Sequence, residues 1–349
     1  SLSERRIADE VAGTLEGLGV ELTEDRTGEV TGSDAGNLLA RIPGPAGART
    51  ILLCAHLDTV PLAAPVEVVE RDGRFENANE AILGADNKAA VAVFLAVARR
   101  LMRTGSPVGV ELLFTTCEER QLAGARAFDR DLLEAEYGFV LDHASPVGEL
   151  IVAAPTFYRL DAELRGQAAH AGIRPEAGRS AIAAAARAVA ALELGRLDEE
   201  TTANVGRIEG GTATNVVAER CRLELETRSL DHDRASAVAR SMVDTIAEAA
   251  SDGECDVETT VEEQFRGYRT RRGARHVEVA ARALESIGIE ASYVPSGGGS
   301  DANVFEARGL PCLNVANGTE RNHQPDERVT RTALESMLDV ALAIVALSA

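Results

Sequence analysis

Three apolar segments in the first half of the chain each end in charged or imidazole side chains. They are RTILLCAHLD (49–58), VGVELLFTTCEE (108–119) and YGFVLDHASP (137–146). Each has the length and the continuous apolar character of a strand that is buried on both faces. Helix-like segments over 5–17 and 87–102 alternate with strand-like ones. This alternation predicts an α/β fold, in which a mostly parallel twisted sheet carries helices on both faces.

The pattern changes near residue 157. FYRLDAELRG alternates like a half-exposed strand, and an Ala-rich helix, two strands, a helix (232–250) and a further strand follow it. This β-α-β-β-α-β order is the split βαβ, or ferredoxin-like, arrangement. The α/β pattern returns after about residue 268. We therefore expect one domain formed by residues 1–156 and 267–349, interrupted by a smaller α+β domain at 157–266.

Composition excludes several classes of partner. The net charge is −20 at pH 7, whereas nucleic-acid binding depends on clustered Lys and Arg. No apolar run reaches the roughly 18–20 residues that span a bilayer, and the first ten residues lack the apolar stretch of a signal peptide. The 5 cysteines lie far apart without a CxxC pair. That spacing favours a reducing cytoplasm over a disulfide framework.

Polar side chains occur where the predicted strands end. In open α/β sheets the ligand crevice lies outside the carboxyl ends of the strands. Two imidazoles and three carboxylates at such an edge could hold two divalent ions, and mixed nitrogen and oxygen ligation favours zinc. One glutamate of a neighbouring pair could then ligate a metal while the other takes a proton from water. The residues concerned are His56, Asp58, Asp86, Glu118, Glu119, Asp142 and His323.

Each of these clusters also has an ordinary structural explanation. A histidine and an aspartate at a strand end are usually a satisfied polar pair, and a glutamate pair that opens a helix is usually stabilised by the helix dipole. An aspartate at a helix entrance is more often an N-cap than a ligand. Only their joint placement after successive buried strands favours a metal site.

Eight motifs extend this interpretation. In order along the chain they are AHLDTV, LGADNKAAVA, TTCEER, VLDH, GQAAHAGIRPEAGRSAI, GGTATNVVAER, SGGGSDANVF and NHQPDE. In the sequence and the order of these motifs the chain resembles the aminoacylase/glutamate-carboxypeptidase/peptidase T superfamily of di-zinc metallopeptidases, and its peptidase T-like branch most closely. The resemblance runs from about residue 36 to the C-terminus. It implies a metal-binding catalytic domain interrupted by a lid or dimerisation domain.

The resemblance also implies a role for each residue of the metal site. Asp86 becomes the carboxylate shared by both ions, and the peptide bond that follows it is expected to be cis. Asp58 would accept the imidazole N–H of His56, and Glu118 would be the general base. The other ligands are implied to be His56, Glu119, Asp142 and His323.

Further residues are implied to act on the substrate. His170 would stabilise the tetrahedral oxyanion, often from across a dimer. Asn215 and Arg228 lie where relatives bind the carboxylate end of the substrate, and Gly298 and Gly299 would let its backbone approach closely. Ordinary surface, loop and strand positions remain the alternative for all of these residues.

The function implied by the resemblance is hydrolysis of an amide bond in short peptides, as in a tripeptidase or aminopeptidase. The expected cofactors are two zinc ions, with cobalt or manganese as alternatives, and the expected assembly is a homodimer. An N-acyl amino acid amidohydrolase with the same machinery remains open, as does a non-catalytic binding protein on this scaffold. Arg120, Gln121 and His143 depart from the family pattern and leave the substrate preference open.

Overall fold

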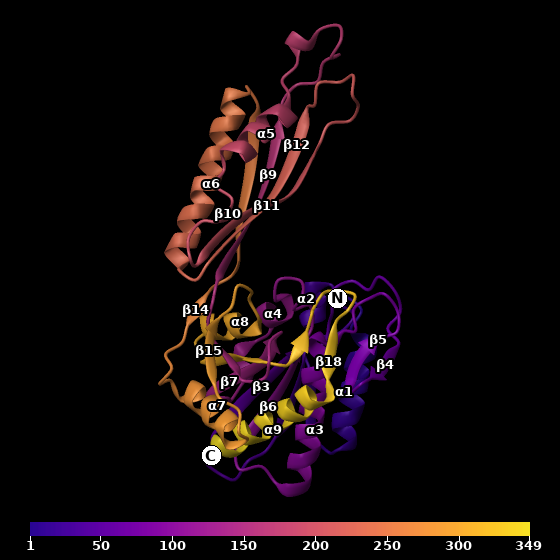
Figure 1. The fold of residues 1–349 in the computed structure, drawn as a ribbon, viewed down its shortest axis with the longest axis vertical. Coiled ribbons are helices and arrows are strands. Elements are labelled where there is room, and N and C mark those ends of the chain that lie inside the picture. The colour runs from indigo at the N-terminus through magenta and orange to yellow at the C-terminus, as the bar shows by residue number, and fades with distance from the viewer. The chain divides into compact units, whose positions relative to one another are not determined.

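The structure, a computed structural model, describes residues 1–349 and divides into two compact units. The first, here called the α/β unit, consists of Ser1–Ala153 and Arg269–Ala349. The second, here called the inserted unit, is Ala154–Tyr268. Each unit has its own sheet and helices (Figure 1). Each also has its own hydrophobic core.

The α/β unit is built on a nine-stranded, mostly parallel sheet. The strand order is β1-β2-β6-β3-β7-β16-β8-β14, and β15 also pairs with β8. The four central strands β6, β3, β7 and β16 run parallel to one another, which confirms the predicted fold class. The strands are β1 (Glu21–Glu24), β2 (Leu38–Ile42), β3 (Thr50–His56), β6 (Gly109–Thr115), β7 (Tyr137–His143), β8 (Glu149–Ala154), β14 (Tyr268–Arg269), β15 (Ser292–Pro295) and β16 (Cys312–Ala316).

Helices cover both faces of this sheet (Figure 1). Helices α1, α3, α7 and α9 pack together, while α8 packs on β7 and β16 and contacts α4. No helix of the molecule is both long enough and apolar enough to cross a membrane. The helices of the unit are α1 (Arg5–Gly17), α2 (Thr27–Thr31), α3 (Ala85–Thr104), α4 (Ala123–Ala127), α7 (Arg275–Ser286), α8 (Asp301–Ala307) and α9 (Arg331–Leu347), with a 3-10 turn at Arg130–Leu132.

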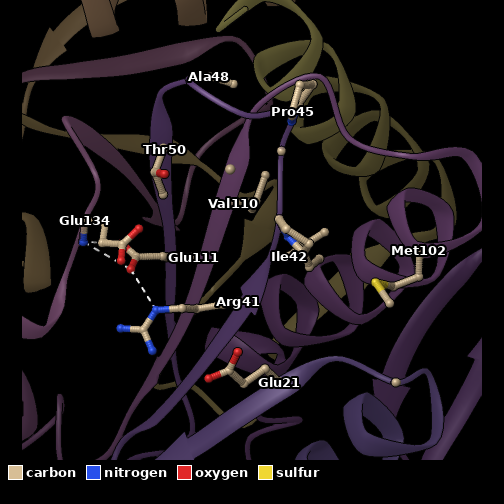
Figure 2. Close-up of a pocket in the computed structure, with 14 residues that line it drawn as sticks. Glu21, Arg41, Ile42, Pro45, Ala48, Thr50, Met102, Val110, Glu111 and Glu134 are labelled. Carbon is tan, nitrogen blue, oxygen red and sulfur yellow. Dashed lines mark hydrogen bonds and ion pairs between the residues drawn. The ribbon is translucent and has the colours of Figure 1, made fainter.

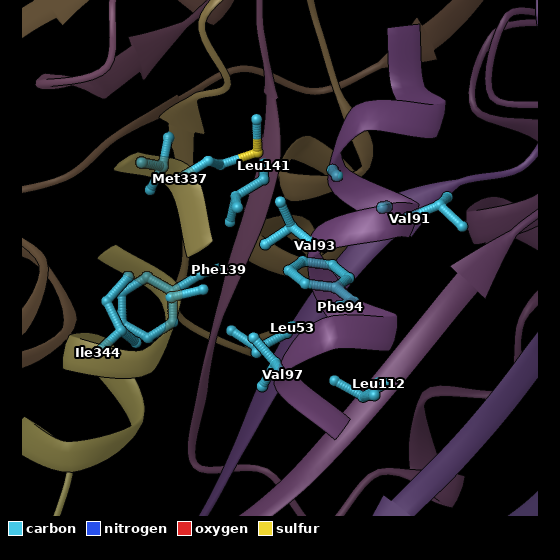
Figure 3. Close-up of a cluster of buried hydrophobic side chains, with 14 of the residues drawn as sticks. Leu53, Val91, Val93, Phe94, Val97, Leu112, Phe139, Leu141, Met337 and Ile344 are labelled. Atoms are coloured by element: carbon cyan, nitrogen blue, oxygen red, sulfur yellow. The ribbon is translucent and has the colours of Figure 1, made fainter. Parts of the chain in front are cut away.

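Burial on both faces explains the continuous apolar runs. Leu53 on β3 and Phe139 on β7 pack with Phe94 of α3 in the core shared with α9 (Figure 3). The next residue along β3, Cys54, points to the other face, where its Sγ lies 3.7 Å from Asp301 of α8. Successive strand residues therefore meet a helix on either side, so neither face of the strand can be polar.

A small antiparallel sheet was not predicted. Its strand order is β17-β18-β5-β4, and the pairing of β18 with β5 joins residues 328–330 to residues 74–76. These strands have only 2 to 4 residues and little buried surface, so they produce no apolar periodicity. They are β4 (Val68–Arg71), β5 (Arg74–Asn77), β17 (Thr319–Glu320) and β18 (Arg328–Thr330).

The inserted unit is an antiparallel sheet covered by two helices. Apart from the two-residue β10, its elements follow the predicted β-α-β-β-α-β order, and the strand order is β10-β11-β12-β9-β13. Four alanines of α5 are fully buried in its core. The elements are β9 (Thr156–Arg165), α5 (Ala181–Ala191), β10 (Gly195–Arg196), β11 (Thr201–Gly210), β12 (Arg220–Ser229), α6 (His232–Asp252) and β13 (Asp256–Phe265), with a 3-10 turn at Pro175–Ala177.

Candidate metal centre

The five predicted ligands come together at the carboxyl edge of the parallel strands. His56 is the last residue of β3, and Asp142 lies near the end of β7. Strand β6 ends at Thr115, earlier than predicted, so Glu119 lies in the turn beyond it. Asp86 is in the first turn of α3, and His323 follows β17.

His56 is the buried centre of the cluster. Its Nε2 lies 3.3 Å from Oδ1 of Asp86 and 3.4 Å from Oδ1 of Asp142. Glu118 lies slightly farther away, with its Oε2 4.0 Å from the same nitrogen.

Asp86 lies between the two imidazoles. While its Oδ1 faces His56, its Oδ2 lies 3.3 Å from Nε2 of His323. His323 is exposed, and its Nε2 is 2.8 Å from Oε1 of Glu119. The two oxygens of Asp86 therefore face two different sets of possible metal ligands, one around His56 and one around His323.

The donor set fits zinc. In tetrahedral zinc sites with bonds of about 2.0–2.1 Å, neighbouring ligand atoms are about 3.3–3.4 Å apart. The separations from His56 to Asp86 and Asp142, and from His323 to Asp86, have this length. Two triplets have all of their ligand atoms within 4.8 Å of one another, namely His56/Asp86/Glu119 and His56/Glu118/Asp142.

The carboxylates of the cluster repel one another. Burial raises the pKa of Asp142 to about 8, and burial together with the charge of Asp142 raises the pKa of Glu118 well above its usual range. Burial would also raise the pKa of Asp86, but hydrogen bonds with His323 and His56 lower it below its usual range. Crowded carboxylates in a buried site call for nearby positive charge, which divalent ions would supply.

The imidazoles respond in the opposite direction. Hydrogen bonds to Asp86 and Glu119 raise the pKa of His323 to about 10. Burial acts to lower the pKa of His56, but the charges of Asp142 and Glu118 raise it well above its usual value. A metal ligand must be a neutral imidazole, so ion binding would displace these protons.

Asp58 orders several members of the cluster. Its Oδ1 lies 3.3 Å from Nδ1 of His56 and accepts the backbone N–H of Glu118 at 2.9 Å. Its Oδ2 accepts the N–H of Glu119 at 3.2 Å. Burial would raise the pKa of Asp58, but the hydrogen bond with His56 outweighs it and lowers the value to about 2. Nδ1 of His56 lies closer still, at 3.1 Å, to the backbone carbonyl oxygen of Asp58, so this residue faces the imidazole with both groups. The two contacts with the glutamate turn were not predicted.

Sequence reasoning missed other residues around the ligands. The Asp86–Asn87 peptide bond is cis, as expected, and Nδ2 of Asn87 donates to Asp142 at 3.2 Å. Asn314 exchanges two hydrogen bonds with the backbone of Asp142, and the buried Asp301 accepts the hydroxyl of Thr115. The sequence offered one signal for each of them. Asn314 is a polar residue inside an apolar strand, and Asn87 and Asp301 are polar residues inside conspicuous motifs.

The glycine-rich loop before α8 has free space where side chains at Gly297 and Gly298 would lie. A Cβ built on Gly297 would meet no atom within 4 Å, and one on Gly298 would meet only Oγ of Ser296 at 3.8 Å. Packing within the chain therefore does not require glycine at either position. Substrate contact at Gly298 and Gly299 stays a prediction.

The three predicted substrate residues of the inserted unit do not form one group. His170 and Asn215 are exposed neighbours, because His170 bridges to Val216 and the N–H of Ala171 donates to the Asn215 carbonyl at 2.9 Å. Arg228 lies near the opposite end of β12, where its guanidinium stacks on a phenylalanine ring at 4.4 Å.

A cavity of about 520 Å³ lies away from these residues (Figure 2). It lies where β3 and β6 begin, opposite the ligand edge, and includes Arg41, Glu111 and Glu134 in its lining. Oε1 of Glu111 accepts from Nε of Arg41 at 3.3 Å and from the Glu134 N–H at 3.1 Å. This cavity contains none of the predicted site residues, and its buried carboxylate is already paired.

A mostly parallel α/β sheet with imidazoles and carboxylates at its carboxyl edge is the arrangement expected of a metallopeptidase. The sequence model of peptidase family M20/M25/M40 matches residues 52–347, and the chain belongs to this family. The predicted resemblance to peptidase T-like metallopeptidases is thereby confirmed.

Three relatives illustrate the similarity. The chain is 39% identical over 329 residues to protein YqjE of Bacillus subtilis (strain 168), which covers 94% of this chain and 89% of that protein. The structure of aminopeptidase PepT from Bacillus cereus ATCC 10987 has 39% identity and a TM-score of 0.90, over 99% of this chain and 93% of that one. A tripeptidase from Staphylococcus aureus subsp. aureus Mu50 has 32% identity and a TM-score of 0.93, over 98% and 92%.

Proposed function

We propose that this metallopeptidase is an exopeptidase that cleaves short peptides, as a tripeptidase or aminopeptidase, with two divalent metal ions. The observation that carries the proposal is the position of Asp86, whose two oxygens each face a different imidazole at 3.3 Å. The similarity to an aminopeptidase and to a tripeptidase supports short peptides as the substrate class.

In this proposal Asp86 would contribute to the donor sets of both ions. His56 and Asp142 would complete the set of one ion, and Glu119 and His323 would complete that of the other. When bound, two zinc ions would lower the pKa of a water molecule and polarise the substrate carbonyl. Cobalt or manganese would suit the same nitrogen and oxygen donors.

Glu118 is proposed to move the proton. Its backbone N–H is held by Asp58, and its Oε2 lies 4.0 Å from His56 Nε2, farther away than the oxygens of Asp86 and Asp142. With five other side chains available as ligands, this carboxylate can accept the proton of the attacking water at one oxygen. It then delivers that proton to the nitrogen of the departing amine.

The inserted unit is proposed to be a lid and dimerisation domain. His170 would stabilise the oxyanion, and Asn215 and Arg228 would hold the carboxylate end of the substrate. The eight residue steps from Arg220 to Arg228 on β12 span roughly 26 Å, whereas a tripeptide spans about 10 Å. One copy of the inserted unit therefore cannot bring all three side chains to one short substrate, and we propose that a second copy in a homodimer supplies the missing ones.

Cysteine usage supports a cytoplasmic location. All five cysteines are buried and free, as is usual for proteins of a reducing compartment.

Metal analysis and peptide assays test the proposed function. Purified protein is expected to hold two divalent ions per chain and to hydrolyse tripeptides. A chelator should abolish activity, and added zinc, cobalt or manganese should restore it. Tripeptides are assayed beside N-acetyl amino acids, because activity on the latter alone would identify an amidohydrolase instead. Protein that binds no divalent ion would contradict the proposal.

Glu118→Gln tests the proton transfer. The amide cannot accept the proton of water, so kcat should fall by about 10²–10⁴-fold. Both ions should stay bound. Glu119→Gln is the matched comparison, because it removes a proposed ligand and should release metal. A Glu118→Gln enzyme that keeps substantial kcat would refute the role of Glu118 as base.

A further inference from the structure

Glu327 is a buried carboxylate that the proposed mechanism does not use. It lies four residues after His323 in the NHQPDE motif, and only 1% of its surface is exposed. Glutamate is rarely buried to this extent unless its charge is paired. The partners of this carboxylate therefore indicate what it does.

Both oxygens of Glu327 accept hydrogen bonds from the segment that carries Asp86. Oε2 accepts the N–H of Gly84 at 2.7 Å, and Oε1 accepts the N–H of Asp86 itself at 2.9 Å. Hydrogen bonds to an ionised carboxylate are shorter and stronger than bonds between neutral groups. Glu327 thus clamps the backbone on which the central carboxylate of the metal site is carried.

We propose that Glu327 is a positioning residue that fixes Asp86 between the two metal ions and so sets the affinity of the protein for both. The proposal rests on the proposed function. Because Glu327 and His323 belong to the same short segment, the clamp also ties a ligand of the second ion to the shared carboxylate.

Glu327 acts through Asp86 rather than as a sixth ligand. Both of its oxygens already bind backbone amides, and it is absent from the two groups of side chains whose ligand atoms converge. Partners that hold metal ligands in place typically change metal affinity by roughly 10–100-fold when they are replaced.

Glu327→Gln tests the clamp with minimal change in size. The amide NH₂ would face one of the two N–H donors, so one donor loses its acceptor and the segment is held at one point only. Zinc affinity, measured on the full-length protein by equilibrium competition with a chelator, is expected to fall roughly 10–100-fold at both binding steps. His323→Ala, which removes a ligand of one ion, should weaken one step only. At saturating zinc, kcat of Glu327→Gln should return close to that of the wild type.

Glu111→Gln is the matched control for a purely structural role. Glu111 is also 1% exposed and also accepts backbone N–H groups, from Glu134 and Ala135, but it lines the cavity at the opposite edge of the sheet. This variant should lose stability and keep the zinc affinity of the wild type.

The outcomes separate the two proposals. Wild-type zinc affinity in Glu327→Gln, or an equal loss of affinity in Glu111→Gln, would overturn the positioning role. Wild-type protein that binds no zinc would instead overturn the proposed function. If Glu327→Gln does not fold, Glu327→Asp, which keeps the charge but shortens the reach, should fold and bind zinc more weakly. Failure of both variants to fold, or wild-type affinity in Glu327→Asp, would also overturn the proposal.

Discussion

Single polar side chains hold the candidate metal site together through backbone amides. Asp58 accepts the N–H groups of Glu118 and Glu119, and Glu327 accepts those of Gly84 and Asp86. Asp58 thereby fixes the turn after β6, and Glu327 fixes the first turn of α3, where the backbone N–H groups have no acceptor within the helix. Predicted ligands that lie outside the strands, such as Asp86 and Glu119, are therefore still held in a defined arrangement.

A single buried histidine, His276, is expected to make the free energy of unfolding depend on pH. It is 5% exposed, its Nε2 lies 3.9 Å from Glu306, and its ring lies beside Tyr137. Burial lowers the pKa of His276 from 6.5 to about 4. Between these values the unfolded chain binds a proton that the folded chain does not, so stability falls as the pH drops from about 7 to 4, by about 2–3 kcal/mol.

His276→Phe should flatten this dependence, because phenylalanine does not titrate. The free energy of unfolding is measured in urea at pH 7.5 and pH 5 by circular dichroism, since the chain has no Trp. A chelator is present throughout, so that metal release does not contribute to the difference. Equal losses in the variant and the wild type would contradict this assignment of the pH effect.

At the scale of elements, the contact between α4 and the turn after β6 is unusually close. A Cβ built on Gly124 of α4 would lie 1.9 Å from the carbonyl oxygen of Thr116, two residues before Glu118. Asn37 also spans this contact, because it accepts the N–H of Thr116 and donates to the carbonyl of Gly124. The glycine lets the helix support the turn that carries the glutamate pair.

Gly124→Ala is expected to displace that turn. The added methyl group should destabilise the protein by about 1–3 kcal/mol and lower kcat, because Glu118 moves with the turn. Thermal unfolding and tripeptide hydrolysis measure the two effects. Gly13→Ala is the control, since a Cβ at Gly13 in α1 meets no atom within 4 Å. That change should stabilise the helix by about 0.5–1 kcal/mol, and a similar result at Gly124 would disprove the close contact.

How much of the fold and of the candidate site could be predicted from the sequence depends on the element concerned. The strands that carry His56 and Asp142 follow from apolar runs, because burial on both faces leaves a plain signal in the sequence. Asp86 and His323 lie outside such runs, so the sequence indicated them only by their places at a helix entrance and after the last apolar strand, and the resemblance supplied their roles. The small sheet of β4, β5, β17 and β18 leaves no periodic signal. The contact of Glu327 with Gly84 joins residues 243 positions apart, and no local pattern reports such a pairing.

At the scale of the whole molecule, the separation of Arg228 from His170 and Asn215 predicts that two subunits build each active site. Light scattering should give a dimer. A mixture of inactive His170→Ala and inactive Glu118→Gln subunits should regain activity, because one site of each mixed dimer combines an intact Glu118 with the partner's intact histidine. Random mixing should give roughly a quarter of wild-type activity. A monomer, or no recovery after subunit exchange, would show that His170 does not act across subunits.

The order of the ligands along the chain has a consequence for synthesis. His56, Asp86, Glu119 and Asp142 all precede the inserted unit, whereas His323 follows it. Strand β16, which lies between β7 and β8 in the sheet, also comes after it. A nascent chain that has left the ribosome as far as residue 268 therefore carries four of the five predicted ligands on an unfinished sheet. In the proposed metal centre, capture of both ions would have to wait until the last part of the polypeptide has been made and folded back.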